Sequence, residues 1–189
     1  MKDAIFALDQ STTHIGHAIF LEGVLDIYGE GIADPPHYDL VRKWVRSHIK
    51  ILQDDGYNVT CAVETLHLHY YPVKNNKTGR VDRKPQVQVF EKLVRAQSHI
   101  WAASRDMGCS VVQVTPYDAM RILTGISDIK TKREDRKTAM VLHASKMLGE
   151  TVSDHVADAV GIGMAYLSNS NGRVQPPAPT NTPNVKSNA

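Results

Sequence analysis

The chain has 189 residues, of which 42% are hydrophobic and 22% are charged, a composition typical of one globular domain with a sizeable core. Its apolar runs are no longer than strands and no charged-then-apolar leader opens it, so we expect no membrane span, no secretion signal and a cytoplasmic location. The formal net charge of +2 excludes little, whereas two cysteines without a CxxC motif indicate reduced thiols and argue against a structural zinc site.

Three strand-like runs open the chain. Residues 4–8 form the first and end at Asp9, a second run follows the polar turn 10–14 and ends at Phe20, and residues 24–31 form the third. Their short spacing predicts an antiparallel meander. A carboxylate at the end of an apolar run is costly to bury alone. Asp9 therefore indicates either a cation site or a turn in which its oxygens accept backbone N–H bonds.

The remaining elements alternate between helices and strands. The apolar spacing predicts a helix over 38–53, a strand over 59–63, a polar loop over 65–85, a helix over 86–106, a strand over 111–114, and helices over 115–123, 134–148 and 154–167. This order predicts an α/β domain whose mixed central sheet has three antiparallel strands and then two parallel ones, flanked by helices. We expect residues 1–168 to form this domain and the Asn-, Pro-, Ser- and Thr-rich residues 169–189 to form a disordered tail.

Acidic residues stand at the ends of strands and at the start of the last helix. Asp9 and Glu64 each end a strand, and parallel strands bring such ends to one edge of a sheet. The last helix begins with DHVAD, in which His155 and Asp158 share a face and Asp154 lies one turn before Asp158. Carboxylates gathered in this way stay ionised together around divalent cations, and their hard oxygens favour Mg²⁺ or Mn²⁺.

The sequence resembles the RuvC family of Holliday junction resolvases, in the ribonuclease-H-like superfamily, over residues 3–168. The resemblance rests on ALDQSTTHIGHAIF in the first two strands, CAVETLHL around the second acid, EKLVRAQSHIWAAS in the long helix and SDHVADAVGIGMAYL in the last helix. It implies a ribonuclease-H-like fold and a homodimer that binds four-way DNA junctions and makes paired nicks with Mg²⁺. Asp9, Glu64 and Asp158 fall on three of the family's four metal-site acids.

The fourth metal-site position falls on His155, a residue that some family members carry there. Asp154 is adjacent, and the sequence does not decide between the two. The family's usual glycine is replaced by Ser11 in the DQS motif. LDQSTT also looks like the phosphate loop of sugar kinases, but this chain lacks the second domain that such a kinase needs. The divergent motif and the basic loop would suit a bacteriophage relative, acting in the cytoplasm of its bacterial host.

Two segments are strongly basic and predict contacts with DNA phosphates. Residues 74–84 carry five bases against one acid, and residues 130–137 carry five bases against two acids. Two tyrosines that precede the first segment could stack on unpaired bases. We expect Lys132 or His155 to assist by charge stabilisation or proton transfer. The predicted DNA-binding residues are Tyr70, Tyr71, Lys74, Lys77, Arg80, Arg83, Lys84, Lys130, Lys132, Arg133 and Lys137.

The sequence therefore predicts a Mg²⁺-dependent, structure-selective endonuclease that cuts four-way junctions, and also other branched DNA. Two-metal hydrolysis would leave 5′-phosphate and 3′-hydroxyl ends. One alternative is a non-catalytic module that binds branched DNA, and another is a less selective ribonuclease-H-like nuclease that acts on forks or hybrids. The preferred cleavage sequence and the degree of junction selectivity stay open, and helix 86–106 is the expected contributor to a dimer interface.

Overall fold

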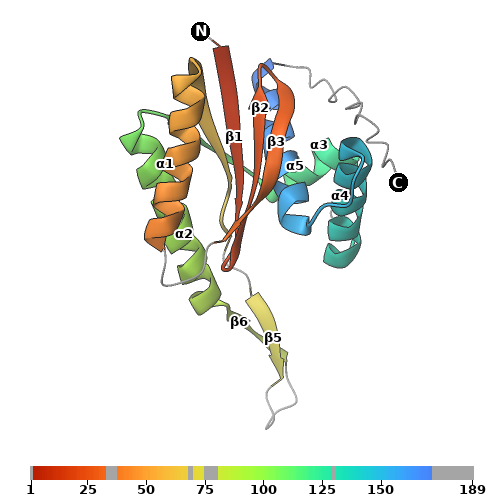
Figure 1. The fold of residues 1–189 in the computed structure, drawn as a ribbon. Helices are drawn as coiled ribbons and strands as arrows, with labels where there is room; N and C mark the ends of the chain where they lie inside the picture. The colour runs from red at the N-terminus through yellow and green to blue at the C-terminus, as the bar shows by residue number, and fades with distance from the viewer. Residues whose placement is uncertain (1, 33–37, 68–69, 75–80, 129–130, 172–189) are drawn as a thin grey trace, which may run out of the picture.

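A computed structural model describes residues 2–32, 38–67, 70–74, 81–128 and 131–171, with the side chains of 32, 70–74, 81–85 and 171 excepted. The chain forms three layers, in which a central sheet lies between two helices on one side and three on the other (Figure 1). No helix within these ranges is long and apolar enough to cross a membrane.

The central sheet has five strands in the order β3-β2-β1-β4-β7. Their bounds are Lys2–Gln10 for β1, His14–Leu21 for β2, Val24–Ile32 for β3, Tyr57–Glu64 for β4 and Ser110–Val114 for β7. β2 pairs antiparallel with both β1 and β3, whereas β4 pairs in parallel with both β1 and β7. The predicted mixed sheet, with three antiparallel strands followed by two parallel ones, is confirmed.

Within the described residues, five helices cover the two faces of this sheet. α1 (Tyr38–Asp54) and α2 (Val87–Asp106) lie on one face, and α3 (Pro116–Thr124), α4 (Arg133–Leu148) and α5 (Asp154–Asn171) lie on the other (Figure 1). The last helix extends past its predicted end at Leu167, so residues 169–171 continue α5 and are not part of a tail. The rest of the predicted tail lies outside the described residues.

Alternate side chains of β1 enter two separate cores. Phe6 and Leu8 pack among residues of α1, α2 and β4, whereas Ile5 and Ala7 pack among residues of α3, α4 and α5. Because successive side chains of a strand point to opposite faces, Asp9 follows Ile5 and Ala7 onto the α5 side. The alternation thus determines which helix meets the acid at the end of the strand.

The segment predicted as a polar loop over 65–85 contains a hairpin. β5 (Tyr70–Lys74) and β6 (Val81–Pro85) pair antiparallel, with Tyr70 opposite Pro85, and form a two-stranded sheet separate from the central one. The expectation of an irregular loop is therefore wrong for these strands. The hairpin projects from the end of the central sheet at which β1 ends (Figure 1).

Candidate metal centre

Asp9 and Glu64 are neighbours at the carboxyl ends of two parallel strands. Leu8 of β1 pairs with Val63 of β4, so the next residue on each strand is an acid. Val63 enters the core under α1 and α2 whereas Ala62 enters the core under α5, and Glu64 therefore points to the α5 side, as Asp9 does. Only 5% of Asp9 is exposed. The register alone places two carboxylates together on one face of the sheet.

The start of α5 reaches this edge because β2 has a glycine at the crossing point. Gly16 pairs with Asp9 across β1 and β2, and a Cβ on Gly16 would lie 1.9 Å from the His155 carbonyl oxygen. The first turn of α5 therefore rests directly on the backbone of β2. Ser153 precedes the helix, and its hydroxyl accepts the N–H of Val156 at 3.2 Å, which caps the helix.

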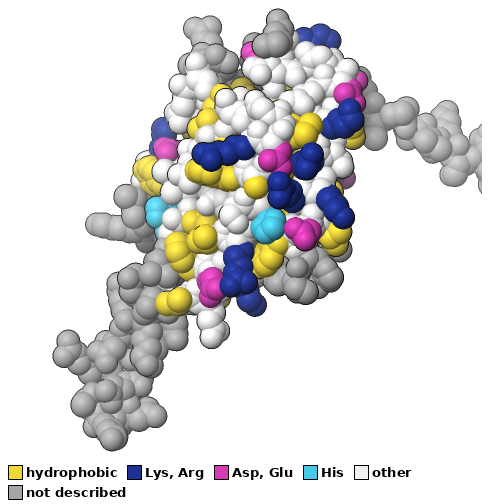
Figure 2. Space-filling model, turned by 90° about the vertical axis from the view of Figure 1, so that its left-hand side faces the viewer, with side chains coloured by type: hydrophobic (Ala, Val, Ile, Leu, Met, Phe, Trp, Pro, Cys, Tyr) yellow, Lys and Arg dark blue, Asp and Glu magenta, His cyan; other side chains and the backbone are white. Residues whose placement is uncertain are grey.

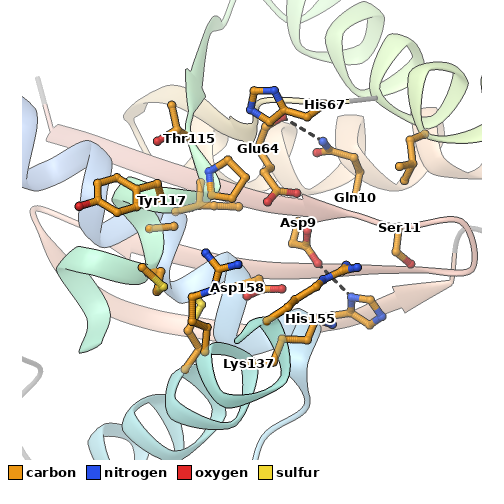
Figure 3. Close-up of a pocket in the computed structure, with 18 of the residues that line it drawn as sticks. Asp9, Gln10, Ser11, Glu64, His67, Thr115, Tyr117, Lys137, His155 and Asp158 are labelled. Atoms are coloured by element: carbon orange, nitrogen blue, oxygen red, sulfur yellow. Dashed lines mark hydrogen bonds and ion pairs between the residues drawn. The ribbon is translucent and has the colours of Figure 1, made fainter. Parts of the chain in front are cut away.

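A cavity of about 650 Å³ opens at this edge of the sheet. Asp9, Glu64 and Asp158 line it, and the side chains of Glu64 and Asp158 lie on either side of Asp9 (Figure 3). Apolar side chains from α2, α3 and α5 form another part of the lining. Among the described residues, the lysine and arginine side chains that line the cavity come from α4 and are those of Arg133, Arg136 and Lys137. An acidic cluster thus faces a basic wall across one space.

Burial and mutual repulsion disfavour the charged forms of two of these acids. Burial raises the pKa of Glu64 to about 8, and the charges of Asp9 and Asp158 contribute further to this shift. Burial, followed by the charge of Asp9, raises the pKa of Asp158 to about 7. Near neutral pH Glu64 and Asp158 therefore retain their full negative charge only if positive charge is supplied beside them.

The two residues considered for the fourth ligand position have different partners. His155 Nδ1 lies 2.9 Å from Asp9 Oδ2, and this hydrogen bond raises the pKa of the imidazole. Asp154 is ion-paired with Lys137, and the hydrogen bond from that ammonium group lowers the pKa of the Asp154 carboxyl. His155 lines the cavity, and Asp154 does not.

The donors in the cavity fit hard divalent cations. Three carboxylates beside one imidazole offer the oxygen-rich ligand set that Mg²⁺ or Mn²⁺ prefers. The raised pKa values of Glu64 and Asp158 indicate a cluster whose repulsion a cation would offset. As placed, no three His, Cys, Asp or Glu side chains within the described ranges form a group that could hold a metal ion, and Asp9 contacts His155 instead.

Other predicted site residues lie away from the cavity or outside the described part of the chain. Lys132 is exposed and immediately precedes α4, and it does not line the cavity, whereas Arg133 and Lys137 do. The hairpin strands hold Tyr70, Tyr71, Lys74, Arg83 and Lys84, placed by their backbone. The residues outside the described ranges are Lys77, Arg80 and Lys130.

Two glutamines that sequence reasoning missed hold the backbone beside the second acid. Gln10 and Gln97 both donate from Nε2 to the Glu64 carbonyl, at 3.0 and 2.9 Å. The only available signal was a polar side chain continuing the apolar strand β1, and nothing marked Gln97. Ser11 closes the adjacent turn, since its hydroxyl accepts the His14 N–H at 2.9 Å and its own N–H donates to the His14 carbonyl at 2.9 Å.

No protein-family model matches the sequence, and a search of curated proteins gives no match. Among solved structures, the chain is similar to T. thermophilus RuvC in complex with a Holliday junction substrate, with 18% identity and a TM-score of 0.59 over 86% of this chain and 92% of that one. It is also similar to another Thermus thermophilus RuvC structure, with 18% identity and a TM-score of 0.57 over 92% of this chain and 99% of that one. The chain therefore has a RuvC-like, ribonuclease-H-like fold.

Proposed function

We propose that this chain is a Mg²⁺-dependent endonuclease that cuts four-way DNA junctions by paired nicks. The observation that supports it most is the cavity in which three carboxylates face the basic side chains of α4. Carboxylates can hold divalent ions, and lysine and arginine side chains can bind phosphates. A phosphodiester lying between them would therefore have both the metal ions and the phosphate contacts that its hydrolysis requires. The similar RuvC from T. thermophilus is in complex with a Holliday junction substrate, which favours a junction here too.

In this proposal the acids and His155 hold the metal ions, and Lys137 supplies a positive charge beside them. Asp9, Glu64, Asp158 and His155 would hold the ions, with Asp9 in the central place. When bound, two divalent ions supply an activated water and charge stabilisation for the leaving 3′ oxygen, which gives 5′-phosphate and 3′-hydroxyl ends. Lys137, whose ammonium group is ion-paired with Asp154, presents a positive charge of fixed position beside the acids.

The DNA would lie across the amino-terminal end of α4 and the hairpin of β5 and β6. Arg133 and Lys137 line the cavity itself, and the exposed Lys132 lies at the start of the same helix. We propose that these residues and the lysines and arginines of the hairpin neutralise DNA phosphates. Tyr70 and Tyr71 would stack on unpaired nucleobases at the junction.

A homodimer would present two such sites to a two-fold symmetric junction. The face of α1 and α2 exposes apolar side chains among lysines and arginines (Figure 2). α2 contributes Val87 and Val94, which are 56% and 42% exposed and do not line the cavity. We propose that α2 contributes to the dimer interface, because burying these side chains removes apolar surface from water.

The test is a cleavage assay with labelled substrates of different shape. Wild type with Mg²⁺ should nick four-way junctions faster than three-way junctions, forks, RNA–DNA hybrids and linear duplex. Glu64→Gln should bind the junction without cutting it, whereas Asp54→Asn, which changes an exposed acid of α1, should cut normally. Cleavage of linear duplex at the junction rate would refute the selectivity. If neither Mg²⁺ nor Mn²⁺ supports any cleavage, the chain is a binding module instead.

A further inference from the structure

The first turns of α4 present three cations to the acidic cluster. Arg133, Arg136 and Lys137 are three and four residues apart, so they share one face of the helix, and all three line the cavity. The surroundings of two of them account for their charge. Lys137 is ion-paired with Asp154, and the exposed Arg133 is accessible to water. Arg136 is the member of this set that these relationships do not explain.

Arg136 is half-buried and forms no ion pair in the part of the chain that the structure describes. No acid there lies within ion-pair distance of its guanidinium group. Its Nε atom is buried and has no hydrogen-bond partner among these residues. A buried donor without a partner typically costs about 1–3 kcal/mol, and more when the group is charged. Arg136 also lines the cavity, so an anion that enters the cavity can reach its guanidinium group.

The shape of the side chain restricts the class of ligand. A guanidinium group offers parallel N–H donors in a planar fork, and this fork matches the two oxygens of a phosphate or a carboxylate. Asp9, Glu64 and Asp158 line the same cavity but do not pair with Arg136. An external anion that reaches Arg136 must therefore tolerate the acids nearby, which a phosphodiester does when cations bridge it to them.

We propose that Arg136 is a positioning residue that binds a non-bridging oxygen of a backbone phosphate in the strand to be cut. The inference rests on the proposed function for the identity of the strand, but it requires only that the cavity binds nucleic acid. Arg136 would fix the phosphate relative to Asp9 and Glu64. Its planar fork would set the orientation of the phosphate, and its charge would add affinity.

Two substitutions separate the charge of Arg136 from its fork. Arg136→Gln removes the charge, and Arg136→Lys keeps the charge but loses the paired donors. Arg46 provides matched controls, because it lies on α1 and not in the cavity. Its guanidinium nitrogen is 3.7 Å from Asp106 Oδ2 in an exposed ion pair. Affinity for a fluorescent four-way junction would be measured in EDTA over a range of salt concentrations, with thermal unfolding of each variant as a check on folding. Single-turnover cleavage with Mg²⁺ would be measured in parallel.

Arg136→Gln should reduce the slope of log affinity against log salt concentration by about 1, as expected for the loss of one phosphate contact. Arg136→Lys should keep the wild-type slope and still slow single-turnover cleavage by about tenfold to a hundredfold, because the phosphate is misplaced. Arg46→Gln and Arg46→Lys should change neither quantity. A purely structural role for Arg136 would lower thermal stability without this split between the two variants.

The outcomes distinguish this inference from the proposed function. If wild type cuts junctions and Arg136→Gln keeps the wild-type salt slope, the inference is wrong and the function stands. If wild type prefers another nucleic acid, the same two readouts are taken on that substrate, and the inference can hold although junction selectivity fails. If wild type binds none of the labelled nucleic acids, both are wrong.

Discussion

Asp9 and Glu64 stand one position beyond the paired residues Leu8 and Val63, on adjacent parallel strands and on the face that α5 covers. Their proximity is therefore set by the register of the sheet and not by flexible side chains alone. Asp158 joins them from α5 and lines the same cavity. The fold holds these like charges together at a cost in stability, which a bound cation would offset.

Removing one of these charges should stabilise the metal-free protein. The pKa of Asp158 is raised to about 7 in the folded state. The folded protein therefore loses stability as the pH rises through that value, because it must then give up a proton that the folded state binds more tightly than the unfolded state does. Above that pH, Asp158→Asn should raise Tm in EDTA by about 2–4 °C for each kcal/mol of relieved repulsion. Mg²⁺ should raise the Tm of wild type and leave the variant unchanged.

Thermal unfolding with EDTA or MgCl₂ checks this, and Asp54→Asn provides a control in which an exposed ion pair with Lys50 is lost. That control should shift Tm little, because exposed pairs contribute only about 0–1 kcal/mol. A lower Tm for Asp158→Asn in EDTA would contradict the repulsion that burial and Asp9 impose.

Gly16→Ala should disable the site by displacing the start of α5. The added Cβ would lie 1.9 Å from the His155 carbonyl oxygen, and neither backbone can yield without moving the helix. We expect cleavage to fall by about a hundredfold, because small displacements of reacting groups have effects of this size. Single-turnover rates of the folded variant, measured below its Tm, give the answer.

Gly163→Ala is the matched comparison, since its Cβ would lie 2.1 Å from the Phe20 ring, also at the contact between α5 and β2. Overpacking of this kind typically costs about 1–3 kcal/mol, so this variant should lose stability. Its activity per folded molecule should nevertheless exceed that of Gly16→Ala. Equal activity losses in the two variants would mean that general destabilisation explains both.

His155 and Asp154 should differ in how their loss affects the metal requirement. His155 contacts Asp9 at 2.9 Å, whereas Asp154 holds Lys137. His155→Ala should raise the Mg²⁺ concentration needed for half-maximal cleavage. Asp154→Asn should slow cleavage several-fold at an unchanged Mg²⁺ requirement, because it frees the Lys137 side chain. A Mg²⁺ titration of both variants decides the matter, and a shifted requirement for Asp154→Asn would reverse the assignment.

Gln10 and Gln97 should be energetically coupled because both donate to the Glu64 carbonyl. Replacement of either by methionine, which has a similar shape, leaves one side-chain donor in place and should cost about 1 kcal/mol. The double variant removes both donors and should cost more than the sum, with a coupling of about 0.5–3 kcal/mol. Denaturant unfolding of the four proteins measures this coupling. Additive effects would show that the two bonds act independently.

The positions of the acids at strand ends, and the order of the strands and helices along the chain, could be predicted because their signals are local and repeated. Asp9 and Glu64 each follow an apolar run, and strand and helix periodicity gives the order of the elements around them. The hairpin of β5 and β6 was missed because its strands, YYPVK and VDRKP, contain proline and charged residues in place of the usual β-branched pattern.

The direction in which each side chain leaves its helix explains the remaining differences between the predicted and the observed lining of the cavity. The basic segment ahead of α4 was visible in the sequence, but which of its members face the acids depends on where the helix begins. The helix starts at Arg133, so Arg133, Arg136 and Lys137 face the cavity and Lys132 stays outside it. The pairing of Lys137 with Asp154 joins two helices, and no spacing within one segment could reveal it.

His17 provides a pH test of the fold that does not involve the candidate metal centre. It lies in β2, only 7% exposed, with its ring 5.1 Å from that of Trp44 and 5.7 Å from that of His48. Its Nδ1 atom is buried without a hydrogen-bond partner in the described ranges. Burial, and then the nearby charge of His48, lowers the pKa of His17 to about 4 from the ordinary value of 6.5.

The sign of the resulting pH dependence follows from proton binding. Between pH 6.5 and 4 the unfolded chain binds a proton at His17 and the folded chain does not, so this residue's contribution to stability is complete above pH 6.5 and is lost as the pH falls toward 4. The loss amounts to about 3 kcal/mol. His17→Phe should lack it, and the difference in unfolding free energy between wild type and this variant isolates it from the opposing contributions of Glu64 and Asp158. A difference that stays constant across this pH range would show that His17 is protonated in the folded state, and the aromatic cluster would then have to accommodate a buried charge.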